Sequence, residues 1–295
     1  MVNLVVGATG FVGSEICRLL IEKGRSVRAL VRETSNPEKV ARLKDLGATL
    51  VTGDLKDRRS IDAACRGAGV VLSTASSTFT RQAGDSIGSV DRQGQLDLVD
   101  AAASAGVEQF VFTSFPPTPL EYPLQSAKRA VEDRLRESGM TYTILQPTFF
   151  TEVWLSPVMG FEPAAGRARV CGAGTNKISW ISFLDVARFA ALAPDTAAAK
   201  NSVVPLGGPD TLSALEIVRM AEQMTGKRIA AEHIPEDALR AQFATATDPF
   251  EKSFAALMLY NAAGHVIDMS GTRRAFGLDR MRSVAEHLGA VTSGV

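Results

Sequence analysis

Cysteine and histidine are scarce in this chain of 295 residues. The three cysteines are scattered and odd in number, and the three histidines lie far apart in the last quarter of the sequence. Neither set has the close spacing of metal ligands, so we expect no metal site. The cysteines also do not form a disulfide framework and are typical of a reducing compartment. We therefore expect a cytoplasmic protein.

The sequence also has no excess of charge of either sign and no long hydrophobic run. Lys+Arg and Asp+Glu both number 32, so the formal net charge is zero, and direct nucleic-acid binding is not indicated. No run of about 18 apolar residues is present to span a membrane. The first apolar run leads into a glycine turn rather than into a signal-peptide cleavage site. We expect a soluble monomer or homodimer with a small-molecule substrate.

The chain opens with an apolar strand, a glycine turn and an amphipathic helix. Gly7 permits a tight turn, Gly10 lets the backbone approach a bulky anion, and Gly13 lets the helix pack close to the sheet. The free amides and the positive dipole end of the helix then face the anion, which suits a pyrophosphate. The predicted dinucleotide-binding residues of this stretch are Gly7, Thr9, Gly10, Phe11, Val12 and Gly13.

Strand and helix patterns alternate six times over the first half of the chain. This alternation predicts an α/β fold with an open, doubly wound parallel sheet of the Rossmann type. The second half is less regular and predicts a smaller, mixed α/β lobe. We predict a dinucleotide-binding domain over residues 1–150 and a substrate-binding lobe over residues 151–295, of which 178–206 returns to the sheet.

Arg32 stands just past the second predicted strand, about 20 residues after the glycine turn, where the adenosine ribose is bound in such folds. An arginine there pairs with a 2′-phosphate, so it favours NADP(H). NAD(H) stays possible because Glu33 could serve the ribose hydroxyls, and Arg32 could also be an ordinary surface residue. After the third strand, Asp54 could accept the adenine amino group while Leu55 packs on the ring. A simple turn aspartate is the alternative for Asp54.

Small and hydroxyl-bearing residues follow the fourth and fifth strands and leave room for a ligand at the carboxyl ends. Aromatic residues near the same strand ends could stack on a planar substrate. The further predicted cofactor residues are Ser73, Thr74, Ala75, Thr113, Ser114, Pro147 and Phe149. The predicted substrate residues are Phe79, Phe115 and Phe150.

Lys128 lies at the edge of the apolar stripe of a helix that we expect to begin near Gln125. It is a candidate catalytic and cofactor-binding residue, and an ordinary helix-surface lysine is the alternative. Two further residues are expected to be helix N-caps, Ser60 before the third helix and Asp185 in the second half.

The segments Gly7-Ala8-Thr9-Gly10-Phe11-Val12-Gly13, Leu30-Val31-Arg32 and Gly53-Asp54-Leu55 resemble the atypical short-chain dehydrogenase/reductases. The NmrA-like branch is the most similar, and residues 132–147 and 181–187 also look like that branch. It holds isoflavone-reductase-like enzymes, NAD(P)H:quinone oxidoreductases and redox-sensing regulators. The resemblance covers most of residues 1–190 clearly and implies an NAD(P)-binding site.

The chain departs from the superfamily pattern Tyr-x-x-x-Lys, because Leu124 stands four residues before Lys128. Tyr122 precedes Pro123 and is expected in a loop. Isoflavone-reductase-like members resemble this chain in keeping the lysine without the tyrosine. The resemblance thus implies an NADPH-dependent reductase of an electron-poor acceptor such as a quinone or enone, with Lys128 at the nicotinamide ribose.

Two other functions stay open at this point. A redox-sensing regulator would bind NAD(P) without turnover and act on a protein partner, and the missing tyrosine favours it. A sugar-nucleotide epimerase or dehydratase shares the glycine motif, but these reactions need the tyrosine base that Leu124 replaces.

Overall fold

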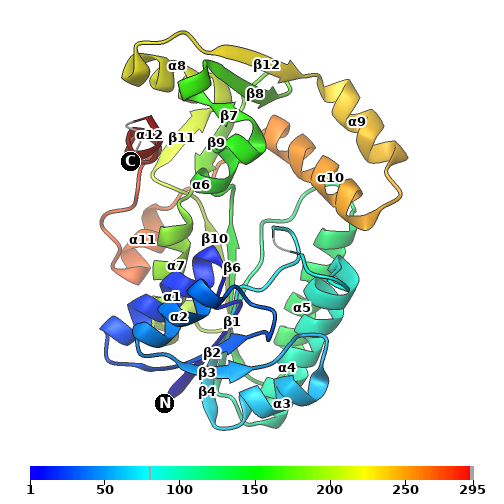
Figure 1. Cartoon of the computed structure of the whole chain (residues 1–295), viewed down its shortest axis with the longest axis vertical. Coiled ribbons are helices and arrows are strands. Elements are labelled where there is room, and N and C mark those ends of the chain that lie inside the picture. Colours follow the sequence, from blue (N-terminus) through cyan, green and yellow to red (C-terminus); the bar gives the residue numbers. More distant parts are fainter. Residues whose placement is uncertain (80, 293–295) are drawn as a thin grey trace. The chain divides into compact units, whose positions relative to one another are not determined.

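The computed structural model describes residues 1–79 and 81–292, and its central feature is a seven-stranded sheet (Figure 1). The strand order is β10-β6-β5-β4-β1-β2-β3, and the pairings among β1 to β6 are all parallel. The order reverses between β1 and β4, the kind of point at which open α/β sheets bind ligands. The strands are β1 Val2–Val6, β2 Ser26–Val31, β3 Thr49–Thr52, β4 Ala68–Ser73, β5 Gln109–Thr113, β6 Thr141–Pro147 and β10 Ser202–Leu206.

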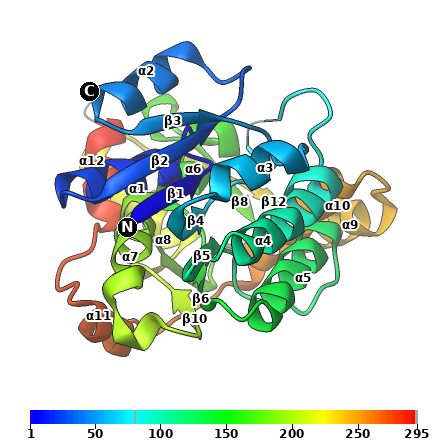
Figure 2. The ribbon, with the colours of Figure 1, turned by 90° about the horizontal axis from the view of Figure 1, so that it is seen from below.

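Helices cover both faces of this sheet, which confirms the predicted Rossmann-type fold. Figure 2 shows α1 and α2 on one side of the first strands and α3, α4 and α5 on the other. A π-helical segment, η1, leads directly into α4. The segments are α1 Phe11–Glu22, α2 Pro37–Asp45, α3 Arg58–Cys65, η1 Ile87–Gly94, α4 Gln95–Ser104, α5 Pro123–Glu137 and α7 Phe183–Leu192, with short 3₁₀ turns η4 Ala193–Asp195 and η5 Ala197–Ala199.

A hydrophobic core of the sheet lies against α3, α4 and α5. Phe110 and Phe112 of β5 have no exposed surface and pack with Leu98 of α4 and Leu135 of α5. Val111 between the two phenylalanines is also buried, so β5 is covered on both faces. This is the usual environment of a parallel strand, and it explains why the strand sequences are apolar runs rather than alternating patterns.

The chain forms two compact units. The first contains Met1–Phe115, Pro123–Gln146 and Val186–Val204, and the second contains Pro116–Tyr122, Pro147–Asp185 and the chain from Pro205 onward. The predicted domain limits, 1–150 and 151–295, stay predictions, although β10 from the segment 178–206 does pair in the large sheet. None of the helices within the described ranges has the length and hydrophobicity of a membrane span.

The second unit has two small sheets, one of β7, β8 and β12 and one of β9 and β11. Its helices pack on these sheets around Trp180, Ile217 and Phe149. The strands are β7 Phe161–Glu162, β8 Arg167–Cys171, β9 Lys177–Trp180, β11 Asp210–Ser213 and β12 Ala230–Ile234. The helices are α6 Thr151–Trp154, η2 Pro157–Met159, η3 Pro163–Ala165, α8 Ala214–Thr225, α9 Glu236–Thr245, α10 Pro249–Ala263, α11 Ser270–Phe276 and α12 Val284–Thr292.

Both predicted N-caps were wrong. Asp57 caps α3 by accepting from Arg59 N, whereas Ser60 lies inside the helix and accepts from Asp54 N at 3.0 Å. Asp185 lies in the first turn of α7, and its carboxylate accepts from Arg282 N at 2.7 Å. Serine and aspartate are common at N-caps, and residue type alone does not tell an N-cap from a position inside the first turn. The contacts in the structure are needed to assign the role.

Gly208 provides a stability test in the second unit. A Cβ at Gly208 would lie 1.4 Å from the Trp180 carbonyl oxygen, so Gly208→Ala requires a backbone shift. We expect a loss of about 3 kcal/mol or more in the free energy of unfolding, measured by urea denaturation. Gly271→Ala is the matched control, because its Cβ would meet nothing within 4 Å and it lies in α11. Equal stability of the two variants would contradict the packing described for Gly208.

Candidate functional site

The glycine turn between β1 and α1 forms the start of the candidate site. Gly7 has a φ of +86°, and Gly10 N donates to Gly7 O at 2.9 Å to close the turn. A Cβ on Gly7 would lie 2.8 Å from both Ala75 N and Thr74 Oγ1, so the turn lies directly against the end of β4. A Cβ on Gly13 would lie 2.2 Å from Gly7 O, which excludes any larger residue without movement. Gly7 and Gly13 thus have the turn and packing roles that the spacing predicted, and the role of Gly10 at an anion stays a prediction.

A cavity of about 120 Å³ opens at the carboxyl ends of β1 to β4, within the first unit. Its wall includes the glycine turn, the end of β2 and the loop after β3, which is where a dinucleotide fold binds its ligand. The predicted cofactor residues in this wall are Gly7, Thr9, Gly10, Arg32, Asp54, Leu55, Thr74 and Ala75.

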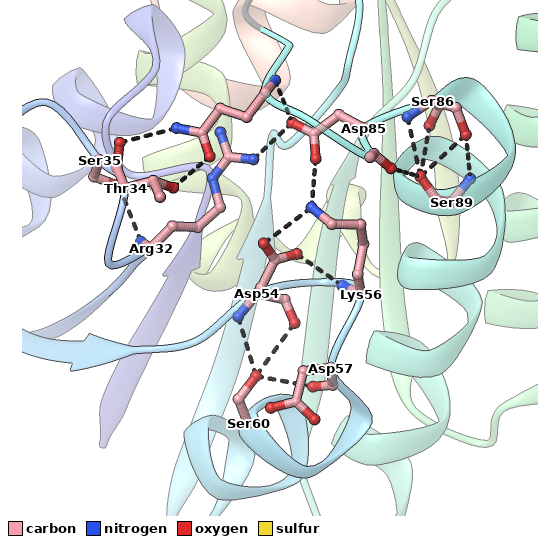
Figure 3. Close-up of polar contacts among 12 residues, drawn as sticks. Arg32, Thr34, Ser35, Asp54, Lys56, Asp57, Ser60, Asp85, Ser86 and Ser89 are labelled. Atoms are coloured by element: carbon pink, nitrogen blue, oxygen red, sulfur yellow. Dashed lines mark hydrogen bonds and ion pairs between the residues drawn. The ribbon is translucent and has the colours of Figure 1, made fainter.

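A network of ion pairs lies at the β2 and β3 side of the cavity (Figure 3). Arg32 Nη1 lies 2.7 Å from Asp85 Oδ2, and Lys56 Nζ donates to Asp85 Oδ1. Lys56 Nζ also lies 3.0 Å from Asp54 Oδ2. Asp85 is the buried member, with 2% of its side chain exposed, while Arg32 and Lys56 are each 28% exposed. The predicted arginine is therefore present at the site, but it is paired within the protein.

The cations and carboxylates of this network stabilise the charged forms of one another. Burial would raise the pKa of Asp85, but the hydrogen bonds from Lys56, Gln82 and Arg32 outweigh it and hold the pKa at about 2. Burial opposes the charged form of Lys56, and the two aspartates more than offset it, so that the pKa of Lys56 lies above its ordinary value. Asp85 and Lys56 are therefore both charged at neutral pH.

Lys128 lies on α5 and is buried, with 6% of its side chain exposed, rather than at the surface. Its ammonium donates to Thr113 O at 3.3 Å and lies 3.8 Å from Asp91 Oδ1. It also lies 4.9 Å from the centre of the Phe112 ring. Burial lowers the pKa of Lys128, and the nearby Asp91 opposes this effect. A buried lysine at the end of β5 contradicts the surface alternative and is typical of a functional cation.

Asp91 links this lysine to the loop after β4. It lies on η1 without exposed surface, and its Oδ2 accepts from Ser77 N at 3.0 Å and Ser77 Oγ at 2.6 Å. Its Oδ1 has no hydrogen-bond partner and faces Lys128 Nζ. π-Helical turns are rare and are frequently found at functional sites. Asp91 therefore positions a buried cation and a loop at once.

The other predicted residues of the first unit lie around these features. Ser73 is buried and donates to Gln95 Oε1 at 2.8 Å. Ser114 accepts from Arg129 Nη2 at 3.0 Å, and the Phe115 ring lies 5.5 Å from the Arg129 guanidinium. The remaining three differ in exposure: Phe11 and Phe79 are more than half exposed, and Val12 is buried.

Pro147, Phe149 and Phe150 belong to the second unit. Phe149 is buried in an aromatic cluster, with its ring centre 4.7 Å from that of Trp154 and 5.3 Å from that of Tyr260. Phe150 is half-buried, and Pro147 is buried at the end of β6. Phe149 therefore has a packing role, and its cofactor role stays a prediction.

A larger cavity, of about 260 Å³, lies within the second unit. Aromatic and sulfur-containing side chains form much of its wall, and the polar wall includes Asn261, whose buried Nδ2 has no hydrogen-bond partner. Such a lining suits a planar apolar molecule with one acceptor group. The apolar wall residues include Trp154, Met159, Phe161, Trp180, Phe254 and Met258.

Sequence reasoning missed Lys56, Asp85 and Asp91. Lys56 could have been found, because it directly follows the predicted pair Asp54 and Leu55 at a strand end. Asp85 and Asp91 carry no such signal, since they reach the site from a loop and a π-helix far along the chain from Arg32. Among the described residues, no group of three or more His, Cys, Asp or Glu side chains could hold a metal ion.

The model of the NmrA-like family matches residues 2–288. The chain belongs to this family. It is 32% identical to the isoflavone reductase homolog IRL of Zea mays over 95% of this chain and 90% of that protein. It is also 32% identical to the photosystem II assembly factor Ycf39 of Cyanophora paradoxa, over 79% of this chain and 71% of that protein. The structure of the NADPH-dependent quinone oxidoreductase QOR2 of Escherichia coli with NADPH has a TM-score of 0.79, 23% identity and 99% coverage of both chains.

The family assignment confirms the predicted NmrA-like resemblance. In this NmrA-like chain the position four residues before Lys128 is Leu124, which is buried on α5. Tyr122 precedes the helix and belongs to the second unit, as expected for a loop residue. Within α5 of this protein, Lys128 therefore has no tyrosine one turn before it.

The glycine turn gives a test of the NmrA-like site that separates binding from folding. A Cβ on Gly10 would meet only Gly7 O, at 3.2 Å, so Gly10→Ala should fold. Its methyl group would narrow the anion site, and we expect NADPH affinity to fall by about tenfold or more. Gly13→Ala should lower both the urea midpoint and the affinity, because of its 2.2 Å contact. A Gly10→Ala variant with wild-type affinity, measured by calorimetry, would place the pyrophosphate elsewhere.

Proposed function

We propose that this NmrA-like protein is an NADP(H)-dependent oxidoreductase that reduces a small, electron-poor acceptor such as a quinone or an enone. The observation that carries the proposal is one cavity that contains the glycine turn and Arg32, at the point where the strand order reverses. The names of a relative, an isoflavone reductase homolog, and of a structural neighbour, an NADPH-dependent quinone oxidoreductase, agree with it.

The residues at the cavity fit such a cofactor. Gly10 leaves room for a pyrophosphate in front of the amides of α1, a helix of 12 residues whose N-terminus attracts anions. Arg32 and Lys56 provide two cations at the adenosine end, where NADP(H) carries its 2′-phosphate. Leu55 is an apolar wall residue for the adenine ring. NAD(H) is the alternative cofactor, because the two cations already have carboxylate partners.

The chemistry divides between cofactor and chain. When bound, the nicotinamide supplies the hydride, and the protein supplies placement and charge. Lys128 would bind the nicotinamide ribose and place positive charge where negative charge develops on the acceptor. Asp91 and Thr113 O hold its ammonium for this role. Because Leu124 replaces a tyrosine acid, the acceptor takes its proton from water, which suits a quinone.

Phe79 and Phe115 of the first unit are proposed to contact the planar acceptor, and Phe150 of the second unit stays a predicted substrate residue. A parallel stack of rings and the exclusion of water would favour close approach of acceptor and nicotinamide. Apolar contacts of this kind select an acceptor by its size and planarity rather than by a specific chemical group, so the acceptor is identified only as a class.

The direct test is binding of NADPH, NADH, NADP⁺ and NAD⁺ to the purified protein, followed by turnover with a panel of quinones and enones. We expect NADPH to bind more tightly than NADH by about tenfold, because a charge-assisted pair forms at the 2′-phosphate. We also expect NADPH oxidation that depends on the acceptor. If none of the four dinucleotides binds, the proposed function is wrong.

Lys128 provides the sharper prediction. Lys128→Met is expected to lower kcat/KM by about 100-fold, because it removes the buried positive charge and keeps the length of the side chain. Burial lowers the pKa of Lys128 below its ordinary value of 10.5. As the pH rises, the ammonium should therefore lose its proton, and wild-type turnover should decline, before pH 10.5 is reached. Lys200→Met, an exposed lysine in the same unit, is the control and should have no effect. Unchanged turnover in Lys128→Met would exclude this lysine from the reaction.

A second function, a regulator that binds NAD(P) without turnover, is favoured by two observations. One relative is named an assembly factor rather than a reductase, and the tyrosine of the superfamily is replaced by Leu124. The turnover panel separates the two functions. Tight binding of the oxidised forms, no acceptor-dependent oxidation of NADPH and a stable protein partner would favour the regulator.

A further inference from the structure

Asp85 occupies the donors at the adenosine end of the cavity (Figure 3). Its Oδ2 accepts from Arg32 Nη1 at 2.7 Å and from Gln82 N at 2.9 Å, and its Oδ1 accepts from Lys56 Nζ. A guanidinium, an ammonium and a backbone amide converge on one anionic group, whose side chain is 2% exposed. The same three kinds of donor are those that proteins use for phosphate.

The charges of this cluster cancel. Arg32 and Lys56 contribute two positive charges, and Asp54 and Asp85 contribute two negative charges. A phosphate that enters while Asp85 stays in place therefore meets a neutral cluster and an adjacent carboxylate, and it gains little from Arg32. If the Asp85 side chain leaves, the cluster has one net positive charge and its best donors become free.

We propose that Asp85 is a built-in competitor of the 2′-phosphate of NADP(H). Its carboxylate holds the donors of Arg32 and Lys56 in the unliganded protein, and it is displaced when the phosphate binds. Asp85 thus sets how strongly the protein prefers NADP(H) over NAD(H). This inference rests on the proposed cofactor and adds a specificity-determining residue to its site.

The start of η1, directly after Asp85, is fixed independently of the Asp85 carboxylate. Ser86 caps η1 by accepting from Ser89 N at 3.0 Å, and Ser89 Oγ accepts from Ser86 N and donates to Gly84 O, each at 3.0 Å. The cap of the helix therefore does not use the Asp85 side chain. Exchange of carboxylate for phosphate then needs a rotation of the Asp85 side chain and the loss of its hydrogen bond from Gln82 N, with the cap of η1 intact.

The test compares wild type with Asp85→Asn by calorimetry, with NADPH and NADH as one pair of probes and adenosine 2′,5′-bisphosphate and AMP as the other. The amide keeps the shape of the side chain and removes its charge. We expect Asp85→Asn to bind NADPH and the bisphosphate about fivefold more tightly or better, and NADH and AMP within about twofold of wild type. Asp85→Ala, which frees the donors completely, should change the affinities in the same direction.

Asp62→Asn is the matched control. Asp62 lies on α3 of the same unit, is 45% exposed and pairs with Arg58 at 2.8 Å, so the same loss of charge there should leave all four affinities unchanged. Weaker or equal NADPH binding in Asp85→Asn would overturn the proposal, because Asp85 would then orient Arg32 and Lys56 for the phosphate. Weaker NADH binding would also overturn it, since Asp85 would then serve the ribose hydroxyl.

Three outcomes separate a failure of the role of Asp85 from a failure of the proposed cofactor. If both Asp85 variants lose their folded circular dichroism, the carboxylate is a structural group that cannot be displaced, and the proposal is wrong. If wild type and Asp85→Asn bind none of the four probes, the proposed cofactor itself is wrong. If wild type binds NADPH and the Asp85 variants show no gain, only the competitor role of Asp85 is lost.

Discussion

The close approach of the Gly13 backbone to the Gly7 carbonyl is the constraint on which the rest of the site depends. A single methyl group at Gly13 would lie 2.2 Å from that oxygen, and one at Gly7 would lie 2.8 Å from Ala75 N. These contacts bring the start of α1 against the ends of β1 and β4, where the strand order reverses. The glycine turn that leads into α1 and the strand ends then share one cavity. Backbone contacts thus position the proposed anion site, and the side chains around it would determine which anion binds.

Side-chain charge is the second constraint on the candidate site, where cations are paired with carboxylates. The Arg32 and Lys56 cations stand at the adenosine end, and Asp85 and Asp54 neutralise them. The Lys128 cation is paired in the same way with Asp91, although more loosely, at 3.8 Å. Each cation with a proposed role at the cofactor is paired with at least one carboxylate, and Arg32 and Lys56 share Asp85. Burial of Asp85, Asp91 or Lys128 without a partner would cost several kcal/mol, so these pairs allow charged residues to lie at the candidate site.

The sequence was sufficient for the fold and for the strand-end part of the site. Apolar runs and glycine spacing depend on local geometry, so the sheet, the glycine turn and Arg32 could be predicted from neighbouring residues. Asp85 could not be predicted, because its partner Arg32 is 53 residues away and a loop aspartate has no periodic pattern. The cap at Asp57 was missed for a different reason: Asp57 and Ser60 are both capping residue types, and the backbone dihedrals choose between them. The burial of Lys128 was only partly visible, as its position at the edge of an apolar stripe.

In the π-helical segment η1, the number of residues between positions 87 and 94 matters as much for the candidate site as the side chains that they carry. Val90 lines the cofactor cavity, Asp91 faces Ser77 and Lys128, and Gln95 just beyond the turn donates to Ala75 O at 2.9 Å. Successive helical residues are rotated by about 100°, so an inserted or deleted residue here would turn the side chains that follow it away from these partners. Most surface segments tolerate a change of length. In this segment such a change would separate the cavity wall, the buried lysine and the end of β4 from one another without altering any functional side chain.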